Sequence, residues 1–95
     1  MPAAYLVDGI LSGTGIRDAV NGGYVEPEQL GLSAPLSREI ADWQQRYEEA
    51  HFDGFPDNDV AQLDIQGAAL ASRAAAERTD VEFGYYSNGL LKRLI

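Results

Sequence analysis

The chain lacks cysteine altogether and has only one histidine, one methionine and one tryptophan among its 95 residues. The absence of cysteine excludes disulfide bonds, thiolate zinc sites and cysteine nucleophiles, and it fits a reducing compartment. Long apolar runs are missing too, because none approaches the length of about 18 residues that a membrane-spanning helix requires. The first apolar run is interrupted by Asp8 and follows no basic segment, unlike a signal peptide. We therefore expect a soluble, cytoplasmic protein with no membrane partner.

Positive charge is also scarce, since seven Lys and Arg residues face fifteen Asp and Glu, for a net charge of −8. Such a chain repels the phosphates of nucleic acids, so we expect no nucleic-acid partner. More than half of the acidic residues occupy about a quarter of the chain, where Arg46 is the only Lys or Arg: Glu39, Asp42, Glu48, Glu49, Asp53, Asp57, Asp59 and Asp64. This clustering is typical either of a solvated face or of a surface that attracts a basic protein.

The length and an apolar fraction of 45% predict one globular domain over residues 1–95. A first strand is expected at Tyr5–Val7 with Ile10 and Leu11, ended either by Gly9 or by the following Gly13 and Gly15. Residues 12–31 read as mostly irregular, and the segment 16–20 fits a helix or a strand equally well. Residues 26–31 suit one helical turn, with Pro27 at its start and Gly31 at its end.

Two longer helices follow. Ser33 is a good N-cap for the first, and Pro35 tolerates a first-turn position because its missing N–H needs no partner there. A helical spacing predicts one buried stripe: Leu36, Ile40, Trp43, Tyr47 and Ala50. Asp42 and Arg46 lie four residues apart, a spacing that allows an ion pair.

The second helix is expected from Asp57–Asp59 to about Arg78, because carboxylates favour the positive end of a helix. Its predicted stripe is Val60, Leu63, Gly67, Leu70, Ala71 and Ala74. Gly67 is a poor helix former, so its place on the stripe suggests a close approach of the first helix, opposite Trp43.

Residues 81–86 are rich in aromatic and β-branched side chains and predict a strand. Ser87–Gly89 is a turn signal, after which residues 90–95 form either a hairpin strand or a short helix. The fold class is therefore α+β, with an antiparallel helix hairpin packed on one face of a small β-sheet in the order β-loop-α-α-β. The apolar tail (Leu90, Leu91, Leu94 and Ile95) either completes the core or pairs two subunits, so we expect a monomer or a homodimer.

The stretch AHFDGFPDND (residues 50–59) holds three aspartates and the single histidine, and it was tested as a metal site. A calcium-binding EF-hand loop needs oxygen ligands at its first, third and fifth positions and glycine at its sixth. Starting at Asp53 puts Phe55 third, and starting at Asp57 puts Ala61 fifth, so both registers fail. One histidine also makes a zinc site unfavourable. The stretch fits a turn between helices, and we predict no metal.

No other motif indicates catalysis. The loop containing Ser12, Thr14 and Arg17 lacks the lysine of a Walker motif and the third glycine of a dinucleotide fingerprint, so a flexible turn is favoured over an anion site. The serines share one base, His51, without a nucleophile elbow. We predict that the protein is not an enzyme and that it has no catalytic residues and no cofactor.

Aromatic residues beside carboxylates predict instead a protein-binding site, because aromatic anchors supply affinity and charge steers a basic partner. The predicted partner-binding residues are Glu48, Glu49, Phe52, Asp53, Phe55, Asp57 and Asp59. The alternative is that one or both phenylalanines, Phe52 and Phe55, close the end of the helix hairpin.

Residues 24–87 resemble small acidic, mostly uncharacterised bacterial proteins, some of them of the immunity kind, which neutralise a cognate secreted toxin. The pattern is carried by Leu30-Gly31-Leu32-Ser33, then Trp43 and Tyr47-Glu48, then Gly67-x-x-Leu70-Ala71 and Val81-Glu82-x-x-Tyr85-Tyr86-Ser87. The resemblance implies a fold and an inhibitory, protein-binding function, but no individual site residue. The alternatives are a phage or mobile-element inhibitor that mimics nucleic acid, and a small enzyme or metal-binding protein.

Overall fold

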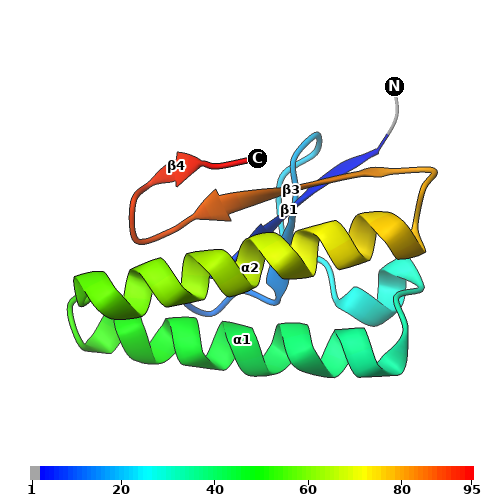
Figure 1. The fold of residues 1–95 in the computed structure, drawn as a ribbon. Helices are drawn as coiled ribbons and strands as arrows, with labels where there is room; N and C mark the ends of the chain where they lie inside the picture. Colours follow the sequence, from blue (N-terminus) through cyan, green and yellow to red (C-terminus); the bar gives the residue numbers. More distant parts are fainter. Residues whose placement is uncertain (1–2) are drawn as a thin grey trace.

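The computed structural model describes residues 3–95 as a sheet with two long helices on one of its faces (Figure 1). The elements, in chain order, are β1 (Ala4–Asp8), β2 (Gly15–Asp18), the 3₁₀ helix η1 (Pro27–Leu30), α1 (Ala34–Phe52), α2 (Asp57–Glu77), β3 (Glu82–Ser87) and β4 (Lys92–Arg93). The predicted α+β class and the helix hairpin on one sheet face are confirmed.

The sheet has the order β2-β1-β3-β4. Its centre is a parallel pair in which β1 lies beside β3, with Tyr5 opposite Phe83 and Val7 opposite Tyr85. The outer strands are antiparallel to their neighbours, because β2 returns along β1 and β4 returns along β3. The helix hairpin occupies the chain between β2 and β3, so it acts as the long connection that a parallel pair requires.

The N-terminal third is more regular than expected. Residues 16–18 of the undecided segment 16–20 belong to a strand, β2, and residues 19–20 lie in the turn that follows it. A further bridge joins Arg17 to Tyr24. β1 ends at Asp8, so the first of the two predicted ends, at Gly9, is confirmed, and Ile10 and Leu11 lie outside the strand. A Cβ at Gly9 would lie 2.5 Å from Cγ of Tyr47, so the chain passes close to α1 directly after β1 ends.

The predicted caps hold the helices. The Ser33 hydroxyl oxygen accepts a hydrogen bond from the Leu36 N–H, and Gly31 ends η1 with a left-handed φ of 70°. Ser33 also donates through both its N–H and its hydroxyl to the Glu77 carboxylate, which ties the start of α1 to the end of α2. Gly54, with a φ of 77°, follows the end of α1 as expected.

Both predicted stripes form the core. Every residue of the α1 stripe and of the α2 stripe is buried, and Val7, Ile16 and Tyr85 of the sheet are fully covered. The Trp43 indole N–H donates to the Leu63 carbonyl oxygen at 2.9 Å, so a polar bond also joins the two helices inside this core.

Gly67 is the point of closest approach between α2 and its neighbours. A Cβ there would collide with the Tyr85 ring and would lie 2.8 Å from Cζ2 of Trp43. The Trp43 and Tyr85 rings meet edge to face at 5.9 Å, and they fill the space that a side chain at residue 67 would need. The predicted contact with Trp43 is confirmed, and β3 approaches the same point.

The C-terminal segment forms the predicted hairpin strand, since β4 pairs with β3. Its apolar side chains do not complete the core: Leu90, Leu91, Leu94 and Ile95 are 39–73% exposed. Within residues 3–95, no helix combines the length and the apolar character needed to cross a membrane.

Replacing Gly67 by alanine tests the close approach. Alanine favours an isolated helix by about 1 kcal/mol, whereas overpacking a core typically costs about 1–3 kcal/mol. We expect Gly67→Ala to lower the free energy of unfolding by about 1–2 kcal/mol in urea titrations. The exposed Ala69→Gly change on the same helix is the control for propensity alone, and a stability gain in Gly67→Ala would contradict the packing described.

Candidate functional site

The predicted partner-binding residues gather at the end of the helix hairpin, around the turn from α1 to α2. Glu49, Asp53, Asp57 and Asp59 are exposed and Glu48 is half-buried. None of these five carboxylates has a Lys or Arg nitrogen within 4 Å; the ion pairs of residues 3–95 lie elsewhere, at Arg17–Asp8, Arg73–Glu39 and Arg78–Asp80. We call these five residues, together with Phe52, the acidic tip.

The two phenylalanines of the turn have different environments. The Phe52 side chain is 79% exposed, whereas Phe55 packs edge to face against His51 at 4.5 Å and reaches the Tyr47 ring at 6.5 Å. Phe55 therefore packs against the end of the core and is only partly exposed. It keeps a left-handed φ of 56°, which is strained for a bulky residue, and its N–H donates to the Ala50 carbonyl oxygen. Phe52 is the apolar side chain that a partner can reach.

The position of the acids relative to the helix ends matters electrostatically. Asp57 and Asp59 lie in the first turn of α2, where the helix dipole favours negative charge. Glu48 and Glu49 lie in the last turns of α1, and Asp53 is its C-cap. At this C-terminal end the helix dipole disfavours negative charge. His51 is the only basic residue in that last turn. The acids at the end of α1 are thus unfavourable for the free protein.

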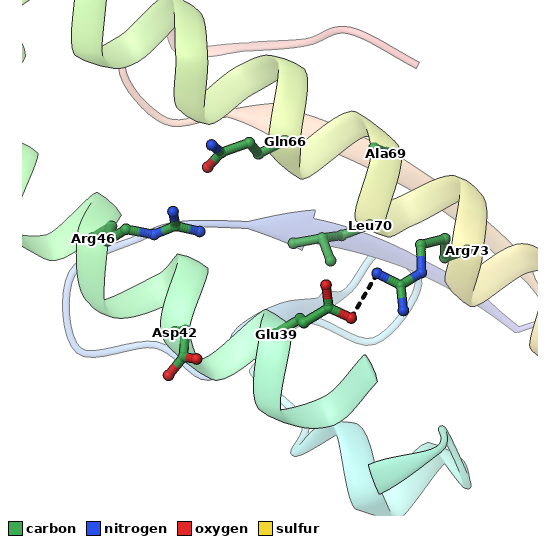
Figure 2. A pocket seen from close by; sticks show the side chains of 7 residues that line it. All are labelled: Glu39, Asp42, Arg46, Gln66, Ala69, Leu70 and Arg73. Carbon is green, nitrogen blue, oxygen red and sulfur yellow. Dashed lines mark ion pairs between the residues drawn. The ribbon is translucent and has the colours of Figure 1, made fainter. Parts of the chain in front are cut away.

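A groove runs along the outer side of the helix pair and leads into the acidic tip. Two hollows, of about 570 Å³ and about 320 Å³, share Arg46 and Gln66, so they form one depression. Figure 2 shows its wider part, where Arg46 and Gln66 extend from opposite helices and the Glu39–Arg73 ion pair closes the far side. Glu49, Asp53 and Asp59 line the narrower part. Sequence reasoning identified these acids but not the groove between them.

One predicted pair is absent from this groove. No ion pair within 4 Å joins Asp42 to Arg46, so that expectation is wrong. Instead Glu39 reaches Arg73 across the helices at 2.6 Å, because the antiparallel hairpin places residues 39 and 73 opposite each other. A contact between two helices depends on their register, which i,i+4 spacing within one helix does not reveal.

A buried polar cluster forms around Asp64 of α2, which is only 7% exposed. Its Oδ1 accepts hydrogen bonds from the hydroxyls of Tyr85 at 2.6 Å and Tyr47 at 3.0 Å, and its Oδ2 accepts from Ser87 at 2.7 Å. Burial raises the pKa of both tyrosines, so they remain protonated donors. The Gly89 N–H in turn donates to the Tyr47 oxygen. With every donor matched, this cluster acts as a structural joint between α1, α2 and β3.

A signal for Asp64 exists in the sequence. It lies four residues after Val60 and three before Gly67, so helical spacing places it on the buried stripe of α2. Counting it with the solvated acids therefore overlooked a buried carboxylate that needs partners.

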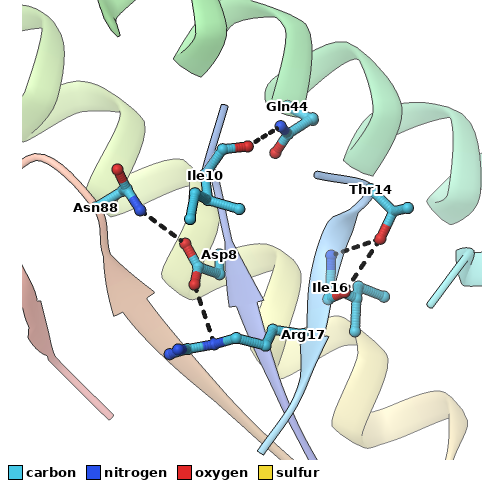
Figure 3. A network of polar contacts seen from close by, with 7 residues as sticks. All are labelled: Asp8, Ile10, Thr14, Ile16, Arg17, Gln44 and Asn88. Carbon is cyan, nitrogen blue, oxygen red and sulfur yellow. Dashed lines mark hydrogen bonds and ion pairs between the residues drawn. The ribbon is translucent and has the colours of Figure 1, made fainter. Parts of the chain in front are cut away.

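A second polar network lies where the sheet meets the loop after β1 (Figure 3). Asp8, only 1% exposed, accepts from the Asn88 amide at 3.2 Å and lies 3.2 Å from the Arg17 Nε. The Arg17 N–H is not aligned for a hydrogen bond, so this contact is an ion pair. The Arg17 guanidinium also lies 4.8 Å from the centre of the Tyr86 ring. Burial raises the Asp8 pKa, although Arg17 and Asn88 oppose this effect.

The glycine-rich loop does not assemble an anion site. Thr14 turns inward and its hydroxyl donates to the Val25 and Ile16 carbonyl oxygens, Arg17 is engaged with Asp8, and Ser12 is exposed. On the α1 side of the loop the Gln44 amide nitrogen holds the Ile10 carbonyl oxygen (Figure 3). The three side chains considered for an anion therefore point to different partners.

His51 is likewise engaged by the backbone. Its Nε2 lies 3.0 Å from the Gly9 carbonyl oxygen, and its ring packs on Phe55. Among residues 3–95, no group of three or more His, Cys, Asp or Glu side chains is arranged to hold a metal ion.

Comparisons with protein-family models, with curated proteins and with solved structures find no significant match. The resemblance to immunity proteins therefore remains a prediction, and the function is argued from the geometry alone.

Asp64→Asn tests the structural joint. An asparagine offers one carbonyl oxygen to three hydroxyl donors and adds an N–H₂ group that faces donors, so buried groups lose their partners. We expect the free energy of unfolding to fall by about 2–4 kcal/mol in denaturant titrations. The exposed Asp59→Asn on the same helix removes only a dipole interaction and should change it by no more than about 1 kcal/mol. Equal effects of the two changes would contradict the role assigned to Asp64.

Asp8→Asn tests the second network through pH. Because the folded pKa of Asp8 exceeds its ordinary value of 3.8, its ionisation weakens the folded state as pH rises above that value. The stability of Asp8→Asn relative to the parent should therefore increase as pH rises above about 3.8.

Asp80→Asn is the control, because the pKa of Asp80 is shifted in the direction opposite to that of Asp8. A hydrogen bond from Arg78 lowers the Asp80 pKa to about 2, so Asp80 favours the folded state above 3.8 and loses this contribution as pH falls towards 2. Its variant should lose stability relative to the parent as pH rises. If the free energy of unfolding changed with pH in the same way for the parent and for Asp8→Asn, the raised pKa assigned to Asp8 would be refuted.

Proposed function

We propose that this chain is a protein-binding inhibitor of the immunity kind, which neutralises a cognate bacterial toxin by covering a basic surface of it with the acidic tip. One observation carries the proposal: Glu48, Glu49 and Asp53 lie at the negative end of α1, where they weaken the free protein and have no cation within 4 Å. A partner's lysine or arginine side chains would remove that repulsion on binding.

The exposed Phe52 adds an anchor to this charge. Aromatic residues dominate the energy of many interfaces, while surrounding charges mainly accelerate and orient association. Phe52 lies at the last position of α1, next to Asp53, so an aromatic ring and carboxylates are presented together. This combination supports an immunity-type contact over mimicry of nucleic acid, in which carboxylates alone would take the place of phosphates.

The partner is sought among the proteins encoded next to this chain. Each neighbouring reading frame is expressed alone and together with it, and we expect one that arrests growth alone and is tolerated when co-expressed. The purified pair should associate at least about tenfold more slowly in 500 mM than in 50 mM salt, because charge steers the encounter. Rates indifferent to salt, or unchanged when Glu48, Glu49, Asp53 and Asp57 are neutralised, would refute the acidic tip.

Glu49→Gln separates binding from stability. Relieving the repulsion at the end of α1 should raise the free energy of unfolding of the isolated protein by roughly 0.3–1 kcal/mol at low salt. The same change should slow association with the toxin. The control Gln45→Lys alters the net charge equally on an exposed position of α1 outside the groove. A Glu49→Gln protein that is less stable than the parent would show that this acid is retained for folding.

A further inference from the structure

On the side of the helices that faces away from the sheet, each helix carries a second stripe of residues at regular spacing. These stripes do not belong to the hydrophobic core. Residues that line the groove alternate at intervals of three and four along each helix: Glu39, Asp42, Arg46, Glu49 and Asp53 on α1, and Asp59, Gln62, Gln66, Ala69 and Arg73 on α2. This is the heptad spacing with which a helix contacts another helix. Both stripes flank the buried stripes and face solvent.

The shape of the groove suits a helix. Its base includes parts of Ala50, Leu63 and Leu70, while charged and amide groups form its walls. From Glu39 to Asp53 it follows two heptads of α1, roughly 21 Å at the usual helical rise. An apolar base with polar walls is how helical pairs receive an amphipathic helix from a partner.

The charges change along the groove. At one end Glu39 and Arg73 neutralise each other, in the middle Arg46 lies opposite Gln66, and at the tip Asp53 and Asp59 line the same hollow with Glu49. Acids on both walls at the tip repel one another, whereas Arg46 offers a positive charge about one heptad away. A helix that pairs with both the acids of the tip and Arg46 must carry cations at one end and a carboxylate near its middle.

Two polar groups in the middle lack partners. The Gln66 Oε1 is inaccessible to solvent yet has no donor, and Gln66 lines both hollows. Arg46 has no carboxylate within 4 Å, although its side chain extends into the groove beside Gln66 (Figure 2). The exposed Arg46 guanidinium is the group here that an occupant can reach, and a carboxylate arriving from outside would pair with it. This observation is independent of the acids at the tip.

We propose that the groove between α1 and α2 is the seat of an amphipathic helix of the protein partner. Lysine or arginine residues at one end of that helix meet Glu49, Asp53 and Asp59, a carboxylate one heptad further along meets Arg46, and apolar side chains contact Leu63 and Leu70. The inference rests on the proposed function and specifies which element of the partner is recognised.

A synthetic helical peptide serves as the probe. It has eighteen residues, with leucine at the a and d positions of each heptad. Three lysines lie in one terminal half, and one glutamate lies seven residues from the middle lysine. Titrated into the isotopically labelled protein, it should shift the backbone amide signals of Arg46, Glu49, Gln62 and Gln66. A peptide with lysine and glutamate exchanged should bind at least about tenfold more weakly. Shifts confined to the turn or the sheet, or equal binding of both peptides, would overturn the proposal.

Exchanging the charges of Arg46 and of the probe tests the orientation of the peptide in the groove. Arg46→Glu should prefer, over the original probe, a peptide whose central glutamate is replaced by lysine. Because Arg46 has no ion pair in the fold, the variant should still fold, and its thermal unfolding is checked first. Failure of the exchanged peptide to recover binding would contradict the assigned contact.

Filling the groove distinguishes this inference from the proposed function. Ala69→Trp places a large ring on the exposed part of the groove, whereas Ala76→Trp places one at an exposed position of α2 outside it. We expect Ala69→Trp alone to weaken toxin binding at least about tenfold. If both variants bind like the parent while neutralising the acidic tip abolishes binding, the proposed function stands and the groove proposal fails.

Discussion

The structure depends on a single buried carboxylate. Asp64 lies on α2, and its two oxygens receive hydroxyl groups from α1 and from β3, so one side chain fixes three elements relative to one another. Apolar contact alone would allow the helices to slide along the sheet, because the hydrophobic effect has no direction. Hydrogen bonds of defined length remove that freedom. The contact of Gly67 with Trp43 and Tyr85, one helical turn further along, is possible only in the register that Asp64 sets.

Much of the fold follows from local rules. The caps at Ser33 and Gly31, the buried stripes of both helices and the hairpin turn at Gly54 were predictable, since each depends on residues close in sequence. The pairing of β1 with β3 was not, because it joins residues some eighty positions apart and leaves no periodic trace. Strand β2 could not be told from a helix for a related reason: four residues of mixed character become a strand only when β1 lies beside them.

The candidate site also has features that could be predicted from the sequence and features that could not. The acids of the tip and the exposure of one phenylalanine were predictable from charge clustering and composition. Which phenylalanine would be exposed depends on the left-handed conformation of Phe55, which turns that ring onto His51 and leaves Phe52 outside. The groove and the Glu39–Arg73 pair required the register of two helices, a property of tertiary packing. Each helix thus has an inner stripe that determines the fold and an outer stripe that is free to serve recognition.

The parallel pair at the centre of the sheet has a consequence for how the chain acquires its structure. During synthesis β1 emerges well before its central neighbour β3, which follows only after both helices are complete. Pairings between such distant segments form late, because closing the long intervening loop is entropically costly before contacts compensate it. The helix hairpin therefore forms while its apolar face still lacks a sheet. The segment after α2, which carries β3, converts a nascent hairpin into a cooperative domain, so the domain becomes competent to fold only after β3 has been made.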